Sequence, residues 1–134
     1  MRKAILTLKM AGFVEEKSRE ILDRYPGQLS EGERHRVALA QVLIREPRLI
    51  ILDEPTGTMD PLTKIDVKHS ILHARDEMDE TFIVVSHDMD FVKDICDRLA
   101  LMRGGKIIQI GKTDEVLSSL TEDERQVMGK ASSV

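Results

Sequence analysis

The chain has 134 residues, a formal net charge of −4 and one cysteine, Cys96. This length suits one domain with a hydrophobic core, and a lone cysteine cannot form an internal disulfide, which favours the cytoplasm. Charges of both signs are interleaved and aromatic residues make up only 3%, so we expect no nucleic-acid partner. No apolar run approaches the roughly 20 residues of a membrane-spanning helix. A membrane-embedded partner protein remains possible.

Helices are predicted for the first third of the chain. Residues 3–24 have a helical pattern, and Gly12 interrupts it between two short helices. Ser30, with Glu33 three residues later, has the spacing of a capping box. It predicts a helix that begins after Ser30 and ends before Pro47.

A strand, a helix and a second strand follow. The apolar run Leu49-Ile-Ile-Leu52 predicts a strand with both faces covered in a parallel sheet. Asp60 and Pro61 suit the cap and first residue of a helix that runs to about Met78, and residues 82–85 predict the second strand. Leu62, Ile65 and Leu72 share one face of this helix. This order predicts a right-handed crossover between parallel neighbours, in an α/β fold.

A hairpin is predicted near the carboxyl end. Gly104-Gly105 separates two apolar runs, residues 99–102 and 106–110, which is a strong hairpin signal. Two short helices are predicted over residues 89–97 and 114–120. We expect the tail, residues 129–134, to be frayed.

Acidic residues end the first predicted strand. Asp53 and Glu54 lie at the edge where open α/β sheets bind ligands. Phosphoryl transfer to water needs one carboxylate near Mg²⁺ and one group to position the water, and we assign these roles to Asp53 and Glu54. His87 follows the next strand and can contact a phosphate. The alternatives are an acidic turn and a structural histidine.

A second candidate site is the start of the helix after Ser30. The backbone N–H groups of Ser30 and Gly32 and the helix dipole behind them form an anion site, with the Ser30 hydroxyl as an extra donor. The alternative is simply a capped helix, and Glu31 opposes phosphate binding unless its side chain turns away. A third hypothesis is a metal site made of protein side chains alone. The spacing of the candidate ligands along the chain follows the order of the strands rather than a compact metal-binding motif. The ligands of this site would be Asp53, Glu54, Asp60 and His87.

Together these segments indicate nucleotide hydrolysis and resemble the ATP-binding-cassette (ABC) ATPases. The matching segments are Leu29 to Glu33 for the signature, Leu49 to Glu54 for the Walker B strand, Gly57 to Asp60 for the D-loop and Ser86 to Asp88 for the switch-histidine loop. Within the family, residues 29–40 and 54–61 most resemble the soluble ATP-binding component of the methyl-coenzyme M reductase activation system of methanogens.

The resemblance implies a partial P-loop NTPase-type fold. Residues 1–46 would be the carboxy-terminal part of the helical subdomain, and residues 47–134 the carboxy-terminal part of the ATPase core. The phosphate-binding glycine loop has no counterpart, because the only Gly-Lys-Thr, at Gly111, has Lys106 in place of the first glycine. We therefore expect the amino-terminal P-loop segment to be absent from this chain.

The resemblance also implies site roles, cofactors and partners. Asp53 would hold Mg²⁺, Glu54 would polarise water and His87 would order the γ-phosphate of ATP. The segment with Leu29, Ser30 and Gly32 would close onto ATP bound by a second cassette, and Asp60 would couple the two halves. The expected partners are the missing amino-terminal part of the same cassette and this second cassette.

Departures from the family pattern leave two functions open. Glu31 replaces the usual first glycine of the signature, Glu33 its glutamine, and Met59 the usual D-loop leucine. One hypothesis is an ATPase portion that is inactive alone; the other is a non-catalytic split or degenerate cassette that acts as an interaction module. In either case, the missing strand would leave an apolar sheet edge beside residues 49–52 that promotes self-association.

Overall fold

The computed structural model describes residues 1–125, so the tail predicted at residues 129–134 lies outside the described part. The chain divides into two compact units. The first unit contains Met1–Leu52 and Met59–Ile83, and the second contains Asp53–Thr58 and the chain from Val84 onward. The boundary crosses the two strands that carry the predicted acidic pair and histidine.

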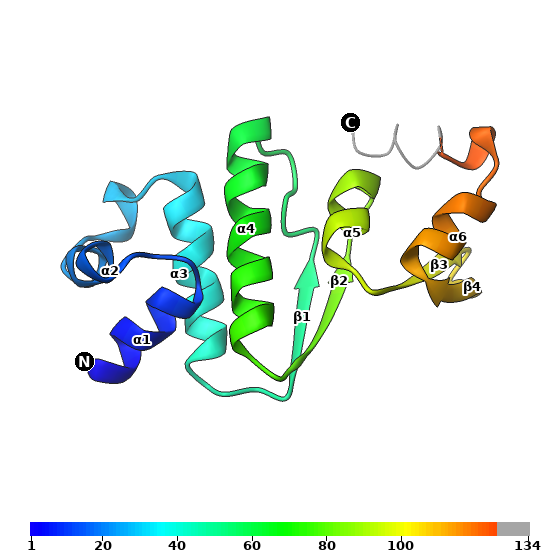
Figure 1. Ribbon diagram of the computed structural model, residues 1–134. Helices are drawn as coiled ribbons and strands as arrows, with labels where there is room; N and C mark the ends of the chain where they lie inside the picture. The colour runs from blue at the N-terminus through cyan, green and yellow to red at the C-terminus, as the bar shows by residue number, and fades with distance from the viewer. Residues whose placement is uncertain (126–134) are drawn as a thin grey trace. The chain divides into compact units, whose positions relative to one another are not determined.

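Four helices build most of the first unit (Figure 1): α1 (Arg2–Met10), α2 (Glu15–Leu22), α3 (Glu31–Leu43) and α4 (Pro61–Glu77), with a short 3₁₀ turn, η1 (Pro26–Gln28). The predicted break at Gly12 is confirmed. Its φ of 94° is left-handed, and an added Cβ would lie 3.3 Å from Ser70 Oγ, so only glycine fits without strain.

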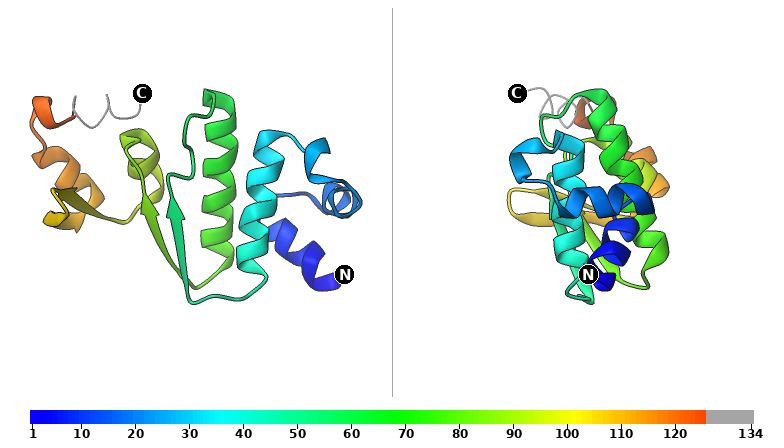
Figure 2. Two further views of the ribbon diagram at one scale, coloured as in Figure 1. Left: turned by 180° about the vertical axis from the view of Figure 1, so that it is seen from behind. Right: turned by 90° about the vertical axis from the view of Figure 1, so that its left-hand side faces the viewer.

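The apolar face of α4 with Leu62, Ile65 and Leu72 is not the stripe that the fold buries most deeply, although Leu72 is half-buried. Leu62 and Ile65 are 75% and 45% exposed, whereas Val67, Ile71 and Ala74 are buried. This difference arises because α4 packs against α1 and α3, and those contacts fix which stripe of the helix turns inward. Figures 1 and 2 show α3 and α4 side by side, with both helices beginning at the same end of the unit.

Strands β1 (Leu49–Asp53) and β2 (Thr81–Val85) are neighbours in a two-stranded sheet, with α4 as the connection between them. They run in the same direction (Figure 1). Hydrogen bonds join both ends of the pair, from Thr81 N–H to the Arg48 carbonyl (3.3 Å) and from Glu54 N–H to the Val85 carbonyl (2.8 Å). The predicted parallel pair is confirmed, and this register places Ile51 beside Ile83.

The prediction that both faces of β1 are covered is wrong. Ile50 is 1% exposed, but its neighbours Leu49 and Ile51 are 48% and 63% exposed. On β2, Ile83 and Val85 are 46% and 49% exposed. A single crossover helix covers one face of a parallel pair, so the other face carries apolar side chains exposed to solvent.

The second unit contains the predicted hairpin, which is confirmed. Strands β3 (Arg98–Arg103) and β4 (Lys106–Lys112) pair antiparallel with an irregularity after Leu101. Gly104 and Gly105 both have positive φ, which a two-residue hairpin turn of this hand requires. Helices α5 (Met89–Ile95) and α6 (Thr113–Ser119) complete the unit. Its buried side chains include Phe91, Val92, Ile95, Leu101, Val116 and Leu120.

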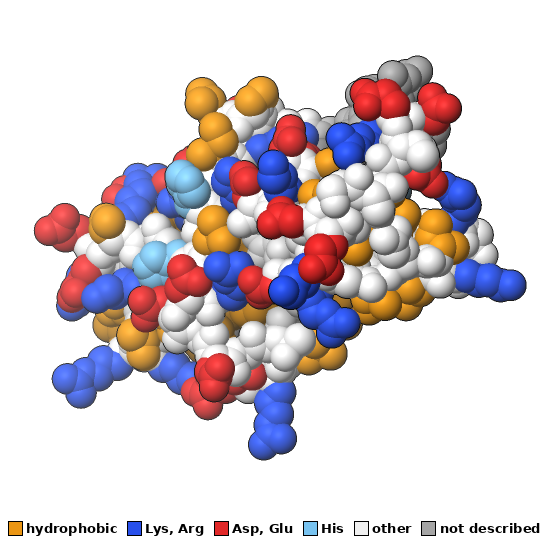
Figure 3. Space-filling view, turned by 45° about the vertical axis from the view of Figure 1, so that its right-hand side comes forward, with side chains coloured by type: hydrophobic (Ala, Val, Ile, Leu, Met, Phe, Trp, Pro, Cys, Tyr) orange, Lys and Arg blue, Asp and Glu red, His pale blue; other side chains and the backbone are white. Residues whose placement is uncertain are grey.

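Surface charge is mixed. On the face drawn in Figure 3, acidic and basic side chains are interspersed rather than gathered by sign. Within residues 1–125, no helix combines the length and apolar character needed to cross a membrane.

Candidate functional site

Glu54 occupies a strained position at the end of β1. Its φ of 47° lies in the left-handed region, which costs a non-glycine residue of order 1–3 kcal/mol. Two hydrogen bonds hold the backbone there: Glu54 N–H donates to the Val85 carbonyl (2.8 Å), and Gly57 N–H donates to the Glu54 carbonyl (3.0 Å). The end of β1 is thereby tied to the end of β2, and the direction of the Glu54 side chain is fixed.

The Glu54 side chain meets His87. Glu54 Oε1 lies 3.4 Å from His87 Nε2. This oxygen is shielded from solvent and accepts no hydrogen bond from the residues that the structure describes, although the Glu54 side chain as a whole is 39% exposed. The exposed part of this carboxylate, beside an imidazole, can orient a water molecule or accept its proton.

The loop that carries His87 is organised by its neighbours. Ser86 Oγ accepts a hydrogen bond from Asp88 N–H (3.0 Å), and Asp88 in turn caps α5 by accepting from Phe91 N–H (3.0 Å). These local bonds hold the short connection between β2 and α5. His87 therefore sits on an ordered turn at the carboxyl end of β2.

Asp53 is the last residue of β1, next to Glu54, and is exposed. Its carboxylate makes no hydrogen bond or ion pair with residues 1–125 in the structure. Over the same residues, no group of three or more His, Cys, Asp or Glu side chains is placed to hold a metal ion. A cation held by Asp53 would therefore take its other ligands from water or a bound phosphate, as Mg²⁺ commonly does.

In the first unit, Ser30 caps α3. Its Oγ accepts from Glu33 N–H (3.1 Å), and Glu33 Oε2 accepts from Ser30 N–H (2.9 Å), so the predicted capping box is confirmed. Lys17 Nζ also lies 3.2 Å from the Glu33 carboxylate. The Ser30 N–H bond first, and Lys17 second, lower the pKa of Glu33. The N–H groups of Glu31 and Gly32 have no intrahelical partner and can meet an anion.

Two residues shape the approach to this helix start. Leu29 is 8% exposed, and its carbonyl accepts from Arg34 Nη1 (3.0 Å), so the residue before the cap is anchored. A Cβ on Gly32 would make only ordinary contacts, the nearest at 3.8 Å to Asp66 Oδ2. Gly32 is therefore not required by packing within this chain; its effect is to leave the helix start open.

Asp60 caps α4. Its Oδ1 accepts from the N–H groups of Leu62 (3.0 Å) and Thr63 (3.1 Å), and Thr63 Oγ1 donates to Oδ2. The Thr63 hydroxyl first, and the Thr63 N–H second, lower the pKa of Asp60. The predicted cap is confirmed. Ser30 and Asp60 thus cap two adjacent helices that begin at the same end of the first unit, whereas Asp53, Glu54 and His87 belong to the second.

Comparison with known proteins gives a consistent result. Residues 2–57 match the ABC transporter family profile. The uncharacterised ABC transporter ATP-binding protein MJ1242 of Methanocaldococcus jannaschii is 60% identical over 126 residues, which are 94% of this chain and 23% of that protein. The glycine betaine/carnitine/choline transport ATP-binding protein OpuCA of Bacillus subtilis is 38% identical over 98 residues, covering 73% of this chain and 26% of OpuCA.

Solved structures agree. CbiO1 of Clostridium perfringens, part of an ABC transporter complex, superposes with a TM-score of 0.77 at 32% identity and covers 88% of this chain. This is the fold of an ABC ATPase domain. The expected partial α/β fold is therefore confirmed. The chain spans 45% of CbiO1 and 46% of the dimeric bacterial cassette MJ0796, which superposes with a TM-score of 0.62 at 29% identity.

Sequence reasoning missed two cations in the first unit. Lys17 contacts Glu33, and Arg36 contacts Asp66 across helices (3.6 Å). Sequence spacing gave no signal for either, because Lys17 lies on a different helix from Glu33, and Arg36 is 30 positions before Asp66. Both contacts depend on helix packing.

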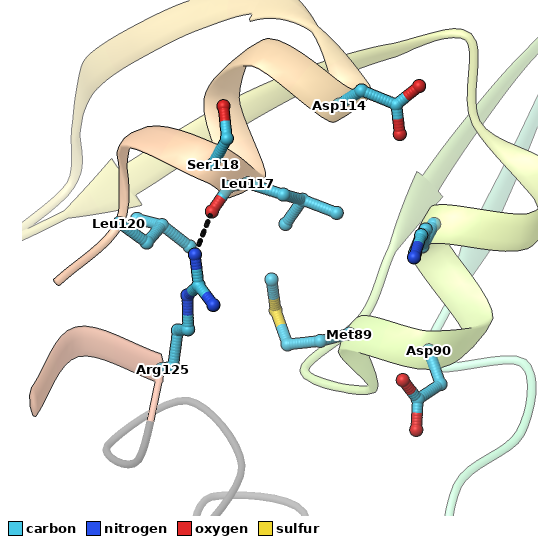
Figure 4. A pocket seen from close by; sticks show the side chains of 8 residues that line it. Met89, Asp90, Asp114, Leu117, Ser118, Leu120 and Arg125 are labelled. Atoms are coloured by element: carbon cyan, nitrogen blue, oxygen red, sulfur yellow. Dashed lines mark hydrogen bonds between the residues drawn. The ribbon is translucent and has the colours of Figure 1, made fainter. Parts of the chain in front are cut away.

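A pocket of about 440 Å³ lies between α5 and α6 in the second unit (Figure 4). Met89, Leu117 and Leu120 line it, and Arg125 Nη2 donates to the Leu117 carbonyl at its edge (3.0 Å). None of the predicted site residues lines this pocket.

Proposed function

We propose that this chain is the carboxy-terminal portion of an ABC-type ATPase. It hydrolyses ATP only together with an amino-terminal portion that supplies the phosphate-binding loop, in a sandwich with a second cassette. The observation that carries this proposal is the 3.4 Å approach of Glu54 Oε1 to His87 Nε2 at the ends of two adjacent parallel strands. The similarity to transport ATP-binding proteins such as OpuCA supports it.

Glu54 acts on water in this mechanism. The Glu54 side chain is 39% exposed, so its carboxylate can meet the attacking water, orient it and take its proton. His87, whose Nε2 lies 3.4 Å from Glu54 Oε1, would order the γ-phosphate beside this carboxylate. The strained backbone of Glu54 fixes the distance between the two groups.

Asp53 would hold Mg²⁺ in the assembled site. Its exposed carboxylate is a hard oxygen ligand of the kind that this ion prefers, and it lies beside the proposed water-activating residue. When bound, Mg²⁺ would neutralise charge on the phosphate oxygens. Asp53 places that charge at the strand end, where phosphate would approach.

The start of α3 serves the opposite cassette. The Ser30 hydroxyl and the N–H groups of Glu31 and Gly32 would meet the γ-phosphate of ATP bound there. Glu33 does not oppose this, because its carboxylate is bound by Ser30 N–H and Lys17. Asp60 would lie at the contact between the halves. The dimeric cassette MJ0796 supports a two-cassette arrangement.

A non-catalytic interaction module is the second candidate. Glu31 favours it, because this exposed carboxylate sits in the first turn of α3, where phosphate would bind. The Glu54–His87 contact disfavours it, since an interaction surface has no need for a strained glutamate held against a histidine.

A complementation assay separates the two functions. The chain would be mixed with the amino-terminal cassette portion of MJ1242, the 60% identical relative, and Mg²⁺-dependent ATP hydrolysis measured. We expect hydrolysis only in the mixture, lost in Glu54→Gln and retained in Glu77→Gln, a control at the exposed end of α4. A mixture that assembles without hydrolysis would support the interaction module. Turnover by the chain alone, lost in Glu54→Gln, would contradict the need for a second portion.

We further propose that the parent protein is the ATP-binding component of a methyl-coenzyme M reductase activation system. This proposal is based on the sequences of residues 29–40 and 54–61. Affinity purification of the tagged chain from a methanogen extract should recover reductase subunits. Recovery of a membrane permease instead would place the protein in a transporter.

A further inference from the structure

Arg36 lies where three segments of the first unit meet. Its guanidinium carbon is 5.6 Å from the centre of the Phe13 ring, between α1 and α2, and its Nη2 is 3.6 Å from Asp66 Oδ1 on α4. The Arg36 side chain is only 23% exposed, and its Nε is shielded without a hydrogen bond to the described residues. A half-buried cation at such a junction links α3 to both neighbours.

The Arg36 contact continues toward the capped ends of two helices. Gly32 lies one turn before Arg36 on α3, and a Cβ there would be 3.8 Å from Asp66 Oδ2 and 4.0 Å from Thr63 Cγ2. Thr63 donates its N–H and its hydroxyl to the Asp60 carboxylate. Gly32 therefore faces Asp66 and Thr63 across a small open space, and Thr63 is in turn bound to Asp60.

We propose that Arg36 is a positioning residue that holds the first turn of α3 in fixed register with the first turn of α4. This inference rests on the proposed function, because it gives one part of the ATP site, the amides of Glu31 and Gly32, a constant placement relative to the Asp60 loop. Arg36 touches neither ATP nor the reacting atoms. It acts through Asp66.

Both contacts of Arg36 favour arginine over lysine. The flat guanidinium can stack on Phe13 while one of its nitrogens reaches Asp66, whereas a lysine ammonium is a single point charge. The Asp66 side chain is 58% exposed, so the ion pair alone contributes little. The register of α3 against α4 should therefore depend on both contacts of Arg36, with Phe13 and with Asp66. Arg36→Lys should then behave like Arg36→Gln.

Amide hydrogen exchange on the 134-residue chain tests the register directly. The reporters are the N–H groups of Glu33 and Arg34, bound to Ser30, and those of Thr63 and Lys64, bound to Asp60. In Arg36→Gln we expect all four to exchange about fivefold faster, on both helices together. Asp66→Asn, which keeps the Phe13 contact, should give a smaller increase on both helices, and the double variant should exchange no faster than Arg36→Gln, because Asp66 acts only through Arg36.

A matched control is Arg19→Gln, which removes an arginine from an exposed pair with Glu15 (3.3 Å). It should leave the four reporter amides unchanged. Faster exchange on α3 alone in Arg36→Gln, with Thr63 and Lys64 unaffected, would overturn the inference, since Arg36 would then stabilise only its own helix.

Kinetics in the complemented mixture, with kcat calculated per folded molecule of the variant, give a readout that loss of stability would not produce. Because the phosphate-binding loop sets ATP affinity, Arg36→Gln should lower kcat about tenfold while KM for ATP stays within about twofold. Unchanged kcat would contradict the inference while the proposed function stands. If the wild-type mixture hydrolyses no ATP, the proposed function fails, and the exchange experiment still decides the role of Arg36.

Discussion

Glu33 and Glu54 show how single carboxylates are used differently in this chain. Glu33 closes the capping box of α3 and pairs with Lys17, so its charge is satisfied within the fold. Glu54 keeps a shielded oxygen without a hydrogen bond from the described residues and is held in a left-handed conformation. The first arrangement stabilises a helix start, whereas the second keeps a reactive group available.

Glu33→Gln tests the first arrangement through pH. The lowered pKa of Glu33 means that its carboxylate stabilises the folded chain above the unfolded pKa, about 4.3, and that this contribution is lost as pH falls through the folded pKa. Glutamine keeps the cap acceptor but not the charge. In thermal unfolding, we expect the variant to be slightly less stable than the unchanged chain at about pH 7. It should also lose less stability than the unchanged chain between about pH 6 and pH 3, a range that includes the unfolded pKa of about 4.3. Identical acid profiles would contradict this role.

Glu54→Gly tests the strain. Glycine adopts a positive φ freely, so replacing an L-residue there should remove a cost of about 1 kcal/mol. We expect Glu54→Gly to unfold at a higher denaturant concentration than Glu54→Gln, which keeps a side chain and the strain. A less stable glycine variant would show that the left-handed backbone carries no cost.

Element-scale burial distinguishes the two faces of β1. Ile50 is 1% exposed and its neighbour Ile51 is 63% exposed, although both belong to one apolar run. The exposed face of the β1–β2 pair offers an apolar surface that other chains can cover.

Ile51→Thr should reduce self-association without loss of fold, because it removes apolar area from an exposed position. Ile50→Thr is the matched variant: a hydroxyl and a smaller side chain at a buried position should cost about 2 kcal/mol or more. Light scattering and denaturant unfolding measure the two effects. Equal self-association of Ile51→Thr and the unchanged chain would show that this face is not the contact.

The elements were predictable where local chemistry decides them, and less so where packing decides. The caps at Ser30 and Asp60 and the turn at Gly104 follow from residues within a few positions of each other. The helical pattern of α4 did not show which apolar residues are buried: Leu62 is 75% exposed, whereas Val67 and Ile71 are buried where α4 packs against α1 and α3. The contact of Arg36 with α4 depends on the same packing.

For the whole molecule, the central observation is how much of each related protein this chain spans. The chain spans about half of the solved cassettes that it resembles, and 23% of its 60% identical relative. The structure brings Glu54 and His87 together in one unit and places Ser30 and Asp60 at one end of the other. A two-cassette sandwich would use both sets.

The most direct test compares ATP binding with ATP turnover in the complemented mixture carrying Glu54→Gln. If Glu54 serves the attacking water, this variant should bind ATP as tightly as the unchanged mixture, within about twofold, and turn it over at least about a hundredfold more slowly. Turnover within a few-fold of the unchanged mixture would contradict the account, because hydrolysis would then not depend on the carboxylate that β1 holds against His87.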